Sequence, residues 1–373
     1  MRLADVRGHD RVRAILARAL ARDRLPPALL FAGPDGVGKK TLALAVAQAV
    51  LCERGPAPDP PPNGKPTSGG EPCGECRACR KISAALAPER LEELRNEADR
   101  HPDEDVWRNF RLHPDLVLAE GWWLTKAGRA RPEPEIRVDQ VRDLIAEIAG
   151  APFEARRRAF VVDDAHTMNE AAQNALLKSL EEPPPRSHVI LVSASPLALR
   201  QTIRSRCQLV RFGPLPRAAV AAHLVERRGT PEEEARTRAA LAGGSLGAAL
   251  AFESEAYGQM REGLVALLER AEALDPLARM EAAEALEQSE DPALLLTTLR
   301  SLLRDLLALR AGAPLESLVH ADIAERLAPL ASGRLGEQAG LLAERAGEAR
   351  FALRGFANKL LTFDLLVDAL AGD

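Results

Sequence analysis

The sequence predicts an α/β domain with a mostly parallel sheet, followed by an all-helical region. Three short apolar runs carry this prediction, at residues 28–32 (ALLFA), 159–164 (AFVVDD) and 188–194 (HVILVSA). Their apolar residues are continuous rather than alternating, which is typical of parallel strands buried on both faces. Because helical patterns lie between the runs, the order of segments favours a parallel sheet.

Helical segments follow from periodicity and capping residues. Thr167 with Glu170 fits a capping box at the start of a helix between the second and third runs, and the prolines at 183–185 stop that helix. Beyond residue 213 the strand signal fades. Helical apolar stripes at residues 293–312 and 358–372 then predict helices that bury against neighbours in the same domain or in another subunit.

Composition narrows the class of protein. The chain has 373 residues, of which 46% are hydrophobic and 28% charged, as in ordinary globular proteins of two or three domains. Its net charge of −4 argues against a basic surface for nucleic acid over the whole molecule. The first residues lack the apolar core of a signal peptide, and the longest uncharged run, at 239–252, is too short to span a bilayer. We therefore expect a cytoplasmic protein with no membrane partner.

A phosphate-binding motif follows the first predicted strand. The stretch GPDGVGKKT matches the pattern G-x-x-x-x-G-K-[ST] in its glycines and first lysine, and a helical run follows it. Backbone N–H groups at such a helix start point at phosphates. The hydroxyl that should bind magnesium is displaced, because a lysine holds its position and a threonine comes one residue late. The candidate nucleotide-binding residues of this degenerate loop are Gly33, Gly36, Gly38, Lys39, Lys40 and Thr41.

Two aspartates end the second predicted strand. Asp163 fits the role of a magnesium ligand, and Asp164 holds the place where a longer glutamate usually polarises the attacking water. Because an aspartate reaches less far than a glutamate, these residues predict weak ATP hydrolysis. Binding of ATP and magnesium stays an open question at this point.

Four of the five cysteines form a cluster in the sequence. They are Cys52, Cys73, Cys76 and Cys79, and the last three read CGECRAC. In a reducing compartment such clustering favours a metal over disulfides, and four thiolates suit a closed tetrahedral zinc site of structural type. Twenty residues separate the first cysteine from the second, so the sequence leaves the fourth ligand open.

The stretches GVGKKT, VVDDAHTMNEAAQNALLKSLEEPP and TIRSRC occur in this order, and the chain thereby resembles clamp-loader subunits of the AAA+ class. Residues 138–145 (VDQVRDLI), 113–115 (HPD) and the cysteine cluster narrow the resemblance to the delta-prime family of bacterial DNA polymerase III. It covers about residues 1–250 through specific motifs and the rest through helical character only. The resemblance implies an AAA+ α/β domain at residues 1–213 with a zinc module at 52–79 and a variable insertion at 88–134, a helical lid at 214–252 and a helical collar at 253–373.

The resemblance also implies a function. Such a subunit acts as a stator in a five-membered ring with ATPase subunits and delta, and the ring loads a sliding clamp on primed DNA in replication. Arg206, in the sequence Ser205-Arg206-Cys207, matches the arginine finger that reaches a neighbour's ATP. Ala194 and Gly247 stand where hydrolysing relatives carry polar and arginine sensors, so we expect no appreciable ATPase activity from this chain alone.

Two other functions remain open from the sequence. The first is a self-sufficient AAA+ ATPase that acts on nucleic acid, which an intact hydroxyl at position 40 and an arginine at position 247 would have supported. The second is a zinc-stabilised DNA-binding module with a vestigial nucleotide fold, against which the acidic balance and the lack of interleaved aromatic residues argue.

Overall fold

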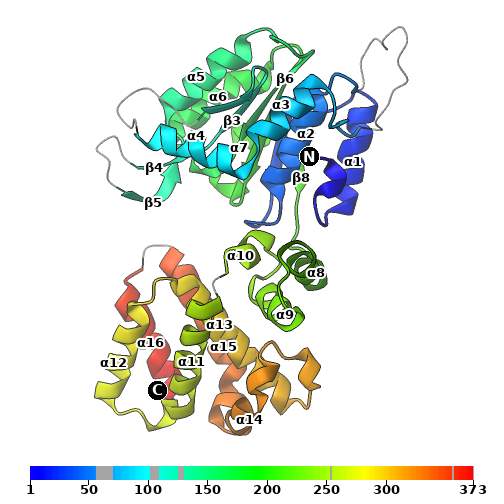
Figure 1. The fold of residues 1–373 in the computed structure, drawn as a ribbon. Coiled ribbons are helices and arrows are strands. Elements are labelled where there is room, and N and C mark those ends of the chain that lie inside the picture. Colours follow the sequence, from blue (N-terminus) through cyan, green and yellow to red (C-terminus); the bar gives the residue numbers. More distant parts are fainter. Residues whose placement is uncertain (56–69, 101–108, 125–129, 253, 355–356, 373) are drawn as a thin grey trace. The chain divides into compact units, whose positions relative to one another are not determined.

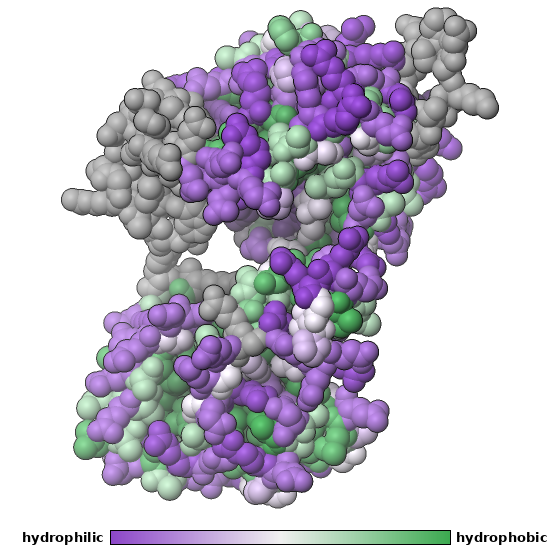
Figure 2. Space-filling view, viewed as in Figure 1, coloured by the Kyte–Doolittle hydropathy of each residue, from purple (hydrophilic) through white to green (hydrophobic). Residues whose placement is uncertain are grey.

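The computed structural model describes residues 1–55, 70–100, 109–124, 130–252, 254–354 and 357–372. The chain forms two compact units, Met1–Ala219 with Ser245–Gly247, and Val220–Gly244 with Ala248–Asp373 (Figure 1). Most of the predicted loop at 53–72 lies outside the described residues. On the face seen in Figure 2, hydrophilic residues are interspersed with smaller hydrophobic patches on both units. Among the described residues, no helix combines the length and the apolar character needed to cross a membrane.

A six-stranded sheet with the order β2-β3-β6-β7-β1-β8 organises the first unit. Every neighbouring pair is parallel except β2 and β3, which pair antiparallel. The strands are β1 (Ala28–Ala32), β2 (Asn109–His113), β3 (Leu116–Ala119), β6 (Arg158–Val162), β7 (Ser187–Ser193) and β8 (Gln208–Arg211). The three strands expected from apolar runs are β1, β6 and β7, and they lie next to one another. The predicted fold class is therefore confirmed.

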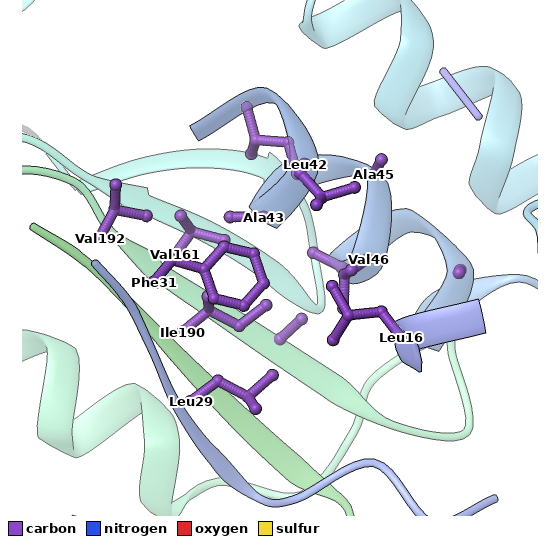
Figure 3. Packing of buried hydrophobic residues seen from close by; sticks show 14 of the residues in the cluster. Leu16, Leu29, Phe31, Leu42, Ala43, Ala45, Val46, Val161, Ile190 and Val192 are labelled. Carbon is purple, nitrogen blue, oxygen red and sulfur yellow. The ribbon is translucent and has the colours of Figure 1, made fainter. Parts of the chain in front are cut away.

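Helices cover both faces of this sheet. They are α1 (Asp10–Ala21), α2 (Lys39–Leu51), α3 (Arg77–Ala85), α4 (Pro88–Arg100), α5 (Val138–Ala149), α6 (Glu170–Glu181) and α7 (Gln201–Arg204). On one face, Leu42 and Val46 of α2 pack on Phe31 and Ile190 of the strands (Figure 3). On the other face, apolar side chains of α5 and α6 pack on the alternate strand residues. Burial on both faces explains why the strands read as continuous apolar runs.

Two details of the first unit differ from the sequence analysis. Residues 109–119, assigned there to an insertion, supply β2 and β3 of the central sheet. The capping box at Thr167 is wrong: Asn169 is the N-cap of α6, and its Oδ1 accepts a hydrogen bond of 2.9 Å from Ala172 N–H. Asparagine is at least as good an N-cap as threonine, and the tight turn after β6 delays the helix to this residue. A separate antiparallel pair is formed by β4 (Trp122–Leu124) and β5 (Ala130–Glu135).

The regular elements of the second unit are all helical in the described residues. They are α8 (Arg217–Arg228) and α10 (Leu246–Leu250), which both begin in the first unit, and α9 (Glu232–Leu241), α11 (Ser254–Arg270), α12 (Pro276–Glu287), α13 (Pro292–Arg310), α14 (Ala324–Ser332), α15 (Arg334–Arg354) and α16 (Lys359–Ala371). The expected apolar stripes are those of α13 and α16, and both bury within this unit, with Leu299, Leu302 and Phe363 fully enclosed.

Short 3₁₀ turns occur in both units. Those of the first unit are η1 (Leu3–Asp5), η2 (Ala165–Thr167) and η3 (Pro196–Ala198), and those of the second are η4 (Ala271–Ala273), η5 (Leu315–Ser317) and η6 (Ala321–Ile323).

Candidate functional site

The glycine-rich loop connects β1 to α2 and has the backbone that its sequence predicts. Gly36 and Gly38 have φ angles of 68° and 97°, in the left-handed region that favours glycine. A Cβ atom at Gly33 would clash with the carbonyl oxygen of Phe212, so glycine is required there by close backbone approach. The loop therefore ends at the N-terminus of α2, where free N–H groups can meet an anion.

Lys39 is engaged within the loop itself. Its Nζ donates a hydrogen bond of 2.6 Å to the carbonyl oxygen of Pro34 and lies 3.7 Å from Asp35 Oδ1. The side chain is only 5% exposed, and this burial lowers the pKa of Lys39 below its ordinary value. The ammonium of Lys39 thus contacts the backbone of its own loop.

Lys40 points to the carboxyl edge of the sheet. Its Nζ forms ion pairs with Glu120, which follows β3, and with Asp163 Oδ2 at 2.9 Å, which follows β6. Arg95 of α4 holds Glu120 with two hydrogen bonds of 2.7 and 2.9 Å. Burial acts to raise the pKa of Glu120, but Arg95 and Lys40 outweigh it and hold this pKa at about 2. The same contacts, with Asp163 foremost, raise the pKa of Lys40 in spite of burial.

Sequence reasoning missed Glu120 and Arg95. Glu120 directly follows the apolar run LVLA, as Asp163 follows its own strand, so a search for acidic residues at strand ends could have found it. Arg95 carries no comparable signal, because it lies among several charged residues of α4.

The other residues predicted for the nucleotide site are Asp164, Thr41 and Ala194, and the structure gives each a different environment. Asp164 has a left-handed backbone, with φ 45° and ψ 44°, and burial followed by the charge of Asp163 raises its pKa. Thr41 is exposed, because the next residue along a helix is turned by about 100°. Ala194 follows β7, and the neighbouring Ser193 has a buried Oγ without a hydrogen-bond partner among the described residues.

Gly247 contacts the backbone of the glycine-rich loop. The segment Ser245–Gly247 belongs to the first unit, and Gly247 N–H donates a hydrogen bond of 2.9 Å to the carbonyl oxygen of Gly36. A Cβ atom at Gly247 would lie 2.9 Å from Gly36 Cα, and a Cβ at Gly36 would clash with Ser245 Oγ. Glycine at position 247 thus permits a backbone contact that an arginine side chain would disrupt.

Arg206 lies between α7 and the edge strand β8. Its Nη1 donates a hydrogen bond of 2.9 Å to the carbonyl oxygen of Thr202, and its guanidinium forms an ion pair with Glu181 at the end of α6. The residue is exposed. The adjacent Cys207 is buried, and this burial raises the pKa of its thiol to about 12, so it is not a nucleophile at neutral pH.

The structure brings Cys52, Cys73, Cys76 and Cys79 together. Their Sγ atoms all lie within 4.8 Å of one another, and the pairs Cys52–Cys76 and Cys73–Cys79 are 4.0 Å apart. A tetrahedral zinc with Zn–S bonds of about 2.3 Å places its sulfurs about 3.8 Å apart. Backbone N–H groups of the last three cysteines donate to sulfurs at 3.3–3.4 Å, and the neighbouring Cys79 thiol lowers the pKa of Cys52 to about 5. The cluster can therefore bind a structural metal such as zinc.

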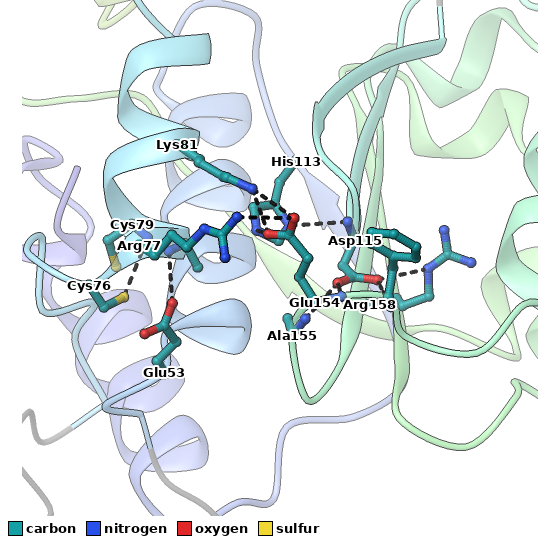
Figure 4. Close-up of polar contacts among 12 residues, drawn as sticks. Glu53, Cys76, Arg77, Cys79, Lys81, His113, Asp115, Glu154, Ala155 and Arg158 are labelled. Carbon is teal, nitrogen blue, oxygen red and sulfur yellow. Dashed lines mark hydrogen bonds and ion pairs between the residues drawn. The ribbon is translucent and has the colours of Figure 1, made fainter.

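A polar network joins the cysteine cluster to the sheet (Figure 4). Lys81 of α3, the helix that begins beside Cys76, binds Glu154 with distances of 2.6 and 2.8 Å. The buried Asp115, from the HPD stretch, accepts backbone hydrogen bonds from Phe153, Glu154 and Ala155 at 2.6–2.8 Å. Asp115 thus has a structural role, since it holds the turn that contacts α3.

Comparison with known proteins identifies the family. The family model described as "DNA polymerase III, delta subunit" matches residues 8–216, more than half of the chain. DNA polymerase III subunit delta' of Pseudomonas aeruginosa is 33% identical over 67% of this chain and 64% of its own length. The corresponding subunit of Bacillus subtilis is 31% identical over 59% of this chain and 52% of its own length.

The alignments with these two relatives span about half to two thirds of the relatives' lengths. DNA polymerase III subunit tau of Bacillus subtilis is also similar, with 28% identity over 60% of this chain and 31% of its own length. The family model and the matches to delta' subunits both place the chain among DNA polymerase III subunits. This chain belongs to the delta-prime family of DNA polymerase III clamp-loader subunits.

Proposed function

We propose that this chain acts as a clamp-loader stator, which assembles with ATPase subunits and delta to place a sliding clamp on primed DNA. In this role it hydrolyses little or no ATP itself and supplies Arg206 to the nucleotide site of a neighbouring subunit. The observation that carries the proposal is the contrast between two sites. Both lysines of the glycine-rich loop contact buried or partly buried groups of the loop and the sheet edge, whereas Arg206 lies beside an edge strand, held by the carbonyl oxygen of Thr202 and a partly exposed ion pair with Glu181.

Loss of turnover follows from the groups that the loop lacks. No hydroxyl stands at position 40, Asp164 is shorter than the usual glutamate, and Ala194 and Gly247 offer no polar side chain to a terminal phosphate. Removing one preorganised donor to a developing charge costs about 3 kcal/mol in an activation barrier. Several such losses together make hydrolysis by this chain negligible.

Arg206 is suited to act on a neighbour because its present partner can be exchanged. The ion pair with Glu181 is partly exposed, and exposed ion pairs contribute only about 0–1 kcal/mol. A nucleotide phosphate of an adjoining subunit carries more charge and accepts two guanidinium hydrogen bonds at once. Arg206 would then stabilise the charge that develops during phosphoryl transfer there.

The test uses the complex reconstituted with the ATPase subunits and delta of the same organism. Arg206→Ala should leave assembly intact but lower ATP hydrolysis at the served site by about 10³–10⁵, with a matching loss of clamp loading on primed DNA. Arg206→Lys should not restore the rate fully, since lysine lacks the planar fork.

Arg200→Ala is the matched control, because Arg200 is an exposed arginine just before α7 that pairs with Glu170. It should retain wild-type hydrolysis and loading. Wild-type values for both activities in the Arg206→Ala complex would remove the finger role. Failure of the wild-type chain to assemble would remove the stator role as a whole.

We also propose that Cys52, Cys73, Cys76 and Cys79 bind one structural zinc ion. The four thiols fit this group, since their Sγ atoms all lie within 4.8 Å of one another, close to the spacing in a tetrahedral zinc site, and four thiolates form a closed set with no open position for chemistry. When bound, zinc would supply only a cross-link between the end of α2 and the start of α3.

A further inference from the structure

The edge of the sheet beside the glycine-rich loop carries two carboxylates, but they are already engaged. Glu120 and Asp163 follow β3 and β6, which are neighbouring parallel strands that end at the same edge. Carboxylate oxygens at such an edge are the ligands that Mg²⁺ prefers. Lys40 Nζ forms an ion pair with both of them.

The charges of this cluster balance without a metal ion. Lys40 and Arg95 supply two positive charges, and Glu120 and Asp163 supply two negative charges. The side chains of Lys40, Glu120 and Asp163 are 28%, 9% and 16% exposed, so solvent screens them only partly. A divalent cation added to these four side chains would bring two further positive charges into a partly buried place that already holds Lys40 and Arg95.

Geometry excludes the metal for a second reason. Magnesium binds oxygen at about 2.0–2.1 Å and requires nearly octahedral geometry. Lys40 Nζ lies 2.9 Å from Asp163 Oδ2 and also binds Glu120, so a cation shared by the two carboxylates would overlap the ammonium. The residues present therefore do not fit a magnesium ion, although the loop has the backbone of a nucleotide site.

We propose that Lys40 is a built-in counterion that occupies the position of the divalent cation and prevents a metal ion from binding at this edge of the sheet. Position 40 thus differs from the motif in two ways. It lacks the hydroxyl that would bind magnesium, and the ammonium of Lys40 occupies the position of the cation. This inference goes beyond the stator role, because a chain that failed to assemble with ATPase subunits could still carry this counterion.

The experiment measures the metal alone, without nucleotide, on the full chain. Lys40→Thr removes the ammonium and restores the motif G-K-T, whereas Lys40→Arg keeps a cation. Mn²⁺, a magnesium substitute detectable by electron paramagnetic resonance, should bind the Lys40→Thr variant at least about tenfold more tightly than wild type. Mg²⁺ should raise the melting temperature of that variant and leave wild type and Lys40→Arg unchanged.

Two further variants secure the interpretation. The double variant Lys40→Thr/Asp163→Asn should lose the gained Mn²⁺ binding, which separates this site from the cysteine cluster. If Lys40→Thr does not fold, the wild-type chain and Asp163→Asn still decide the matter. Mn²⁺ bound by wild type and lost in Asp163→Asn would overturn the proposal, as would equal gains in Lys40→Thr and Lys40→Arg.

Discussion

His320 lies fully buried in the second unit, between side chains of two helices. Its Nδ1 lies 3.3 Å from the Tyr257 hydroxyl of α11, and its Nε2 lies 2.7 Å from Ser301 Oγ of α13. The adjacent Asp305 accepts hydrogen bonds from the backbone N–H groups of Val319 and His320. Burial lowers the pKa of His320 from 6.5 to about 4. The neutral imidazole is therefore part of the packing of this unit.

We predict that the second unit loses stability as the pH falls from about 6.5 to 4. In this window the unfolded chain binds a proton at residue 320 and the folded chain does not, so protonation favours unfolding. A shift from 6.5 to about 4 corresponds to roughly 3 kcal/mol, which is fully present above pH 6.5 and lost at pH 4. Amide hydrogen exchange in α13 at several pH values measures this change.

The variant His320→Gln provides the comparison. At pH 8 the variant should have a lower free energy of opening of α13 than wild type. This difference in free energy should shrink as the pH approaches 4, because only wild type loses the contribution of the neutral His320. A deficit that stays constant with pH would contradict the role assigned to His320.

At the scale of elements, α2 joins the two candidate sites. It begins at Lys39 in the glycine-rich loop and ends at Leu51, directly before Cys52, whose backbone N–H donates to the carbonyl oxygen of Ala49. Its apolar residues pack under the sheet, and its buried Gln48 donates to the carbonyl oxygen of Cys79. A metal at the cysteine cluster would thus fix the C-terminal end of the helix whose N-terminus forms the loop.

We predict one zinc ion per chain in protein purified without chelators. Cys76→Ser should reduce the zinc content to near zero and lower the melting temperature of the first unit. Binding of a structural zinc is worth about 10–16 kcal/mol in small peptides, against total stabilities of about 5–15 kcal/mol, so even a fraction of it is large. Elemental analysis and thermal unfolding measure the two effects.

Cys207→Ser is the matched control, since Cys207 is buried but lies outside the cluster. It should keep one zinc ion. Zinc-free wild-type protein, or equal zinc loss in both variants, would contradict the assignment of the cluster.

At the scale of the whole molecule, the family assignment and the glycine-rich loop, where Lys40 occupies the cation position, both lead us to expect little ATP hydrolysis. We predict that the isolated chain hydrolyses ATP no faster than its own Lys39→Ala variant, because several groups that act on metal, water or phosphate are missing. Steady-state phosphate release measures this rate. Turnover of about one per second that depends on Lys39 would fall in the normal enzyme range and would instead support a self-sufficient ATPase.

Local runs made the centre of the sheet predictable from the sequence. The strands β1, β6 and β7 are buried on both faces, so each needs a continuous apolar run that is visible in isolation. The strands β3 and β8 have only four residues each, and QLVR of β8 is largely exposed. The run LVLA of β3 is apolar and buried, but it is too short to be assigned with certainty in isolation, whereas β8 is a strand because β1 supplies its hydrogen bonds, which no local pattern reveals.

By itself, the sequence determined the glycine turn, the lysine in place of a hydroxyl and the cysteine spacing, since each is a matter of residue type within a few positions. Only the tertiary structure decided which carboxylates pair with Lys40, because Glu120 lies 80 residues away along the chain. It likewise placed Cys52 beside the other three cysteines across the predicted loop. Ion pairs and metal sites depend on distance through space, and the parallel sheet and its helices set those distances.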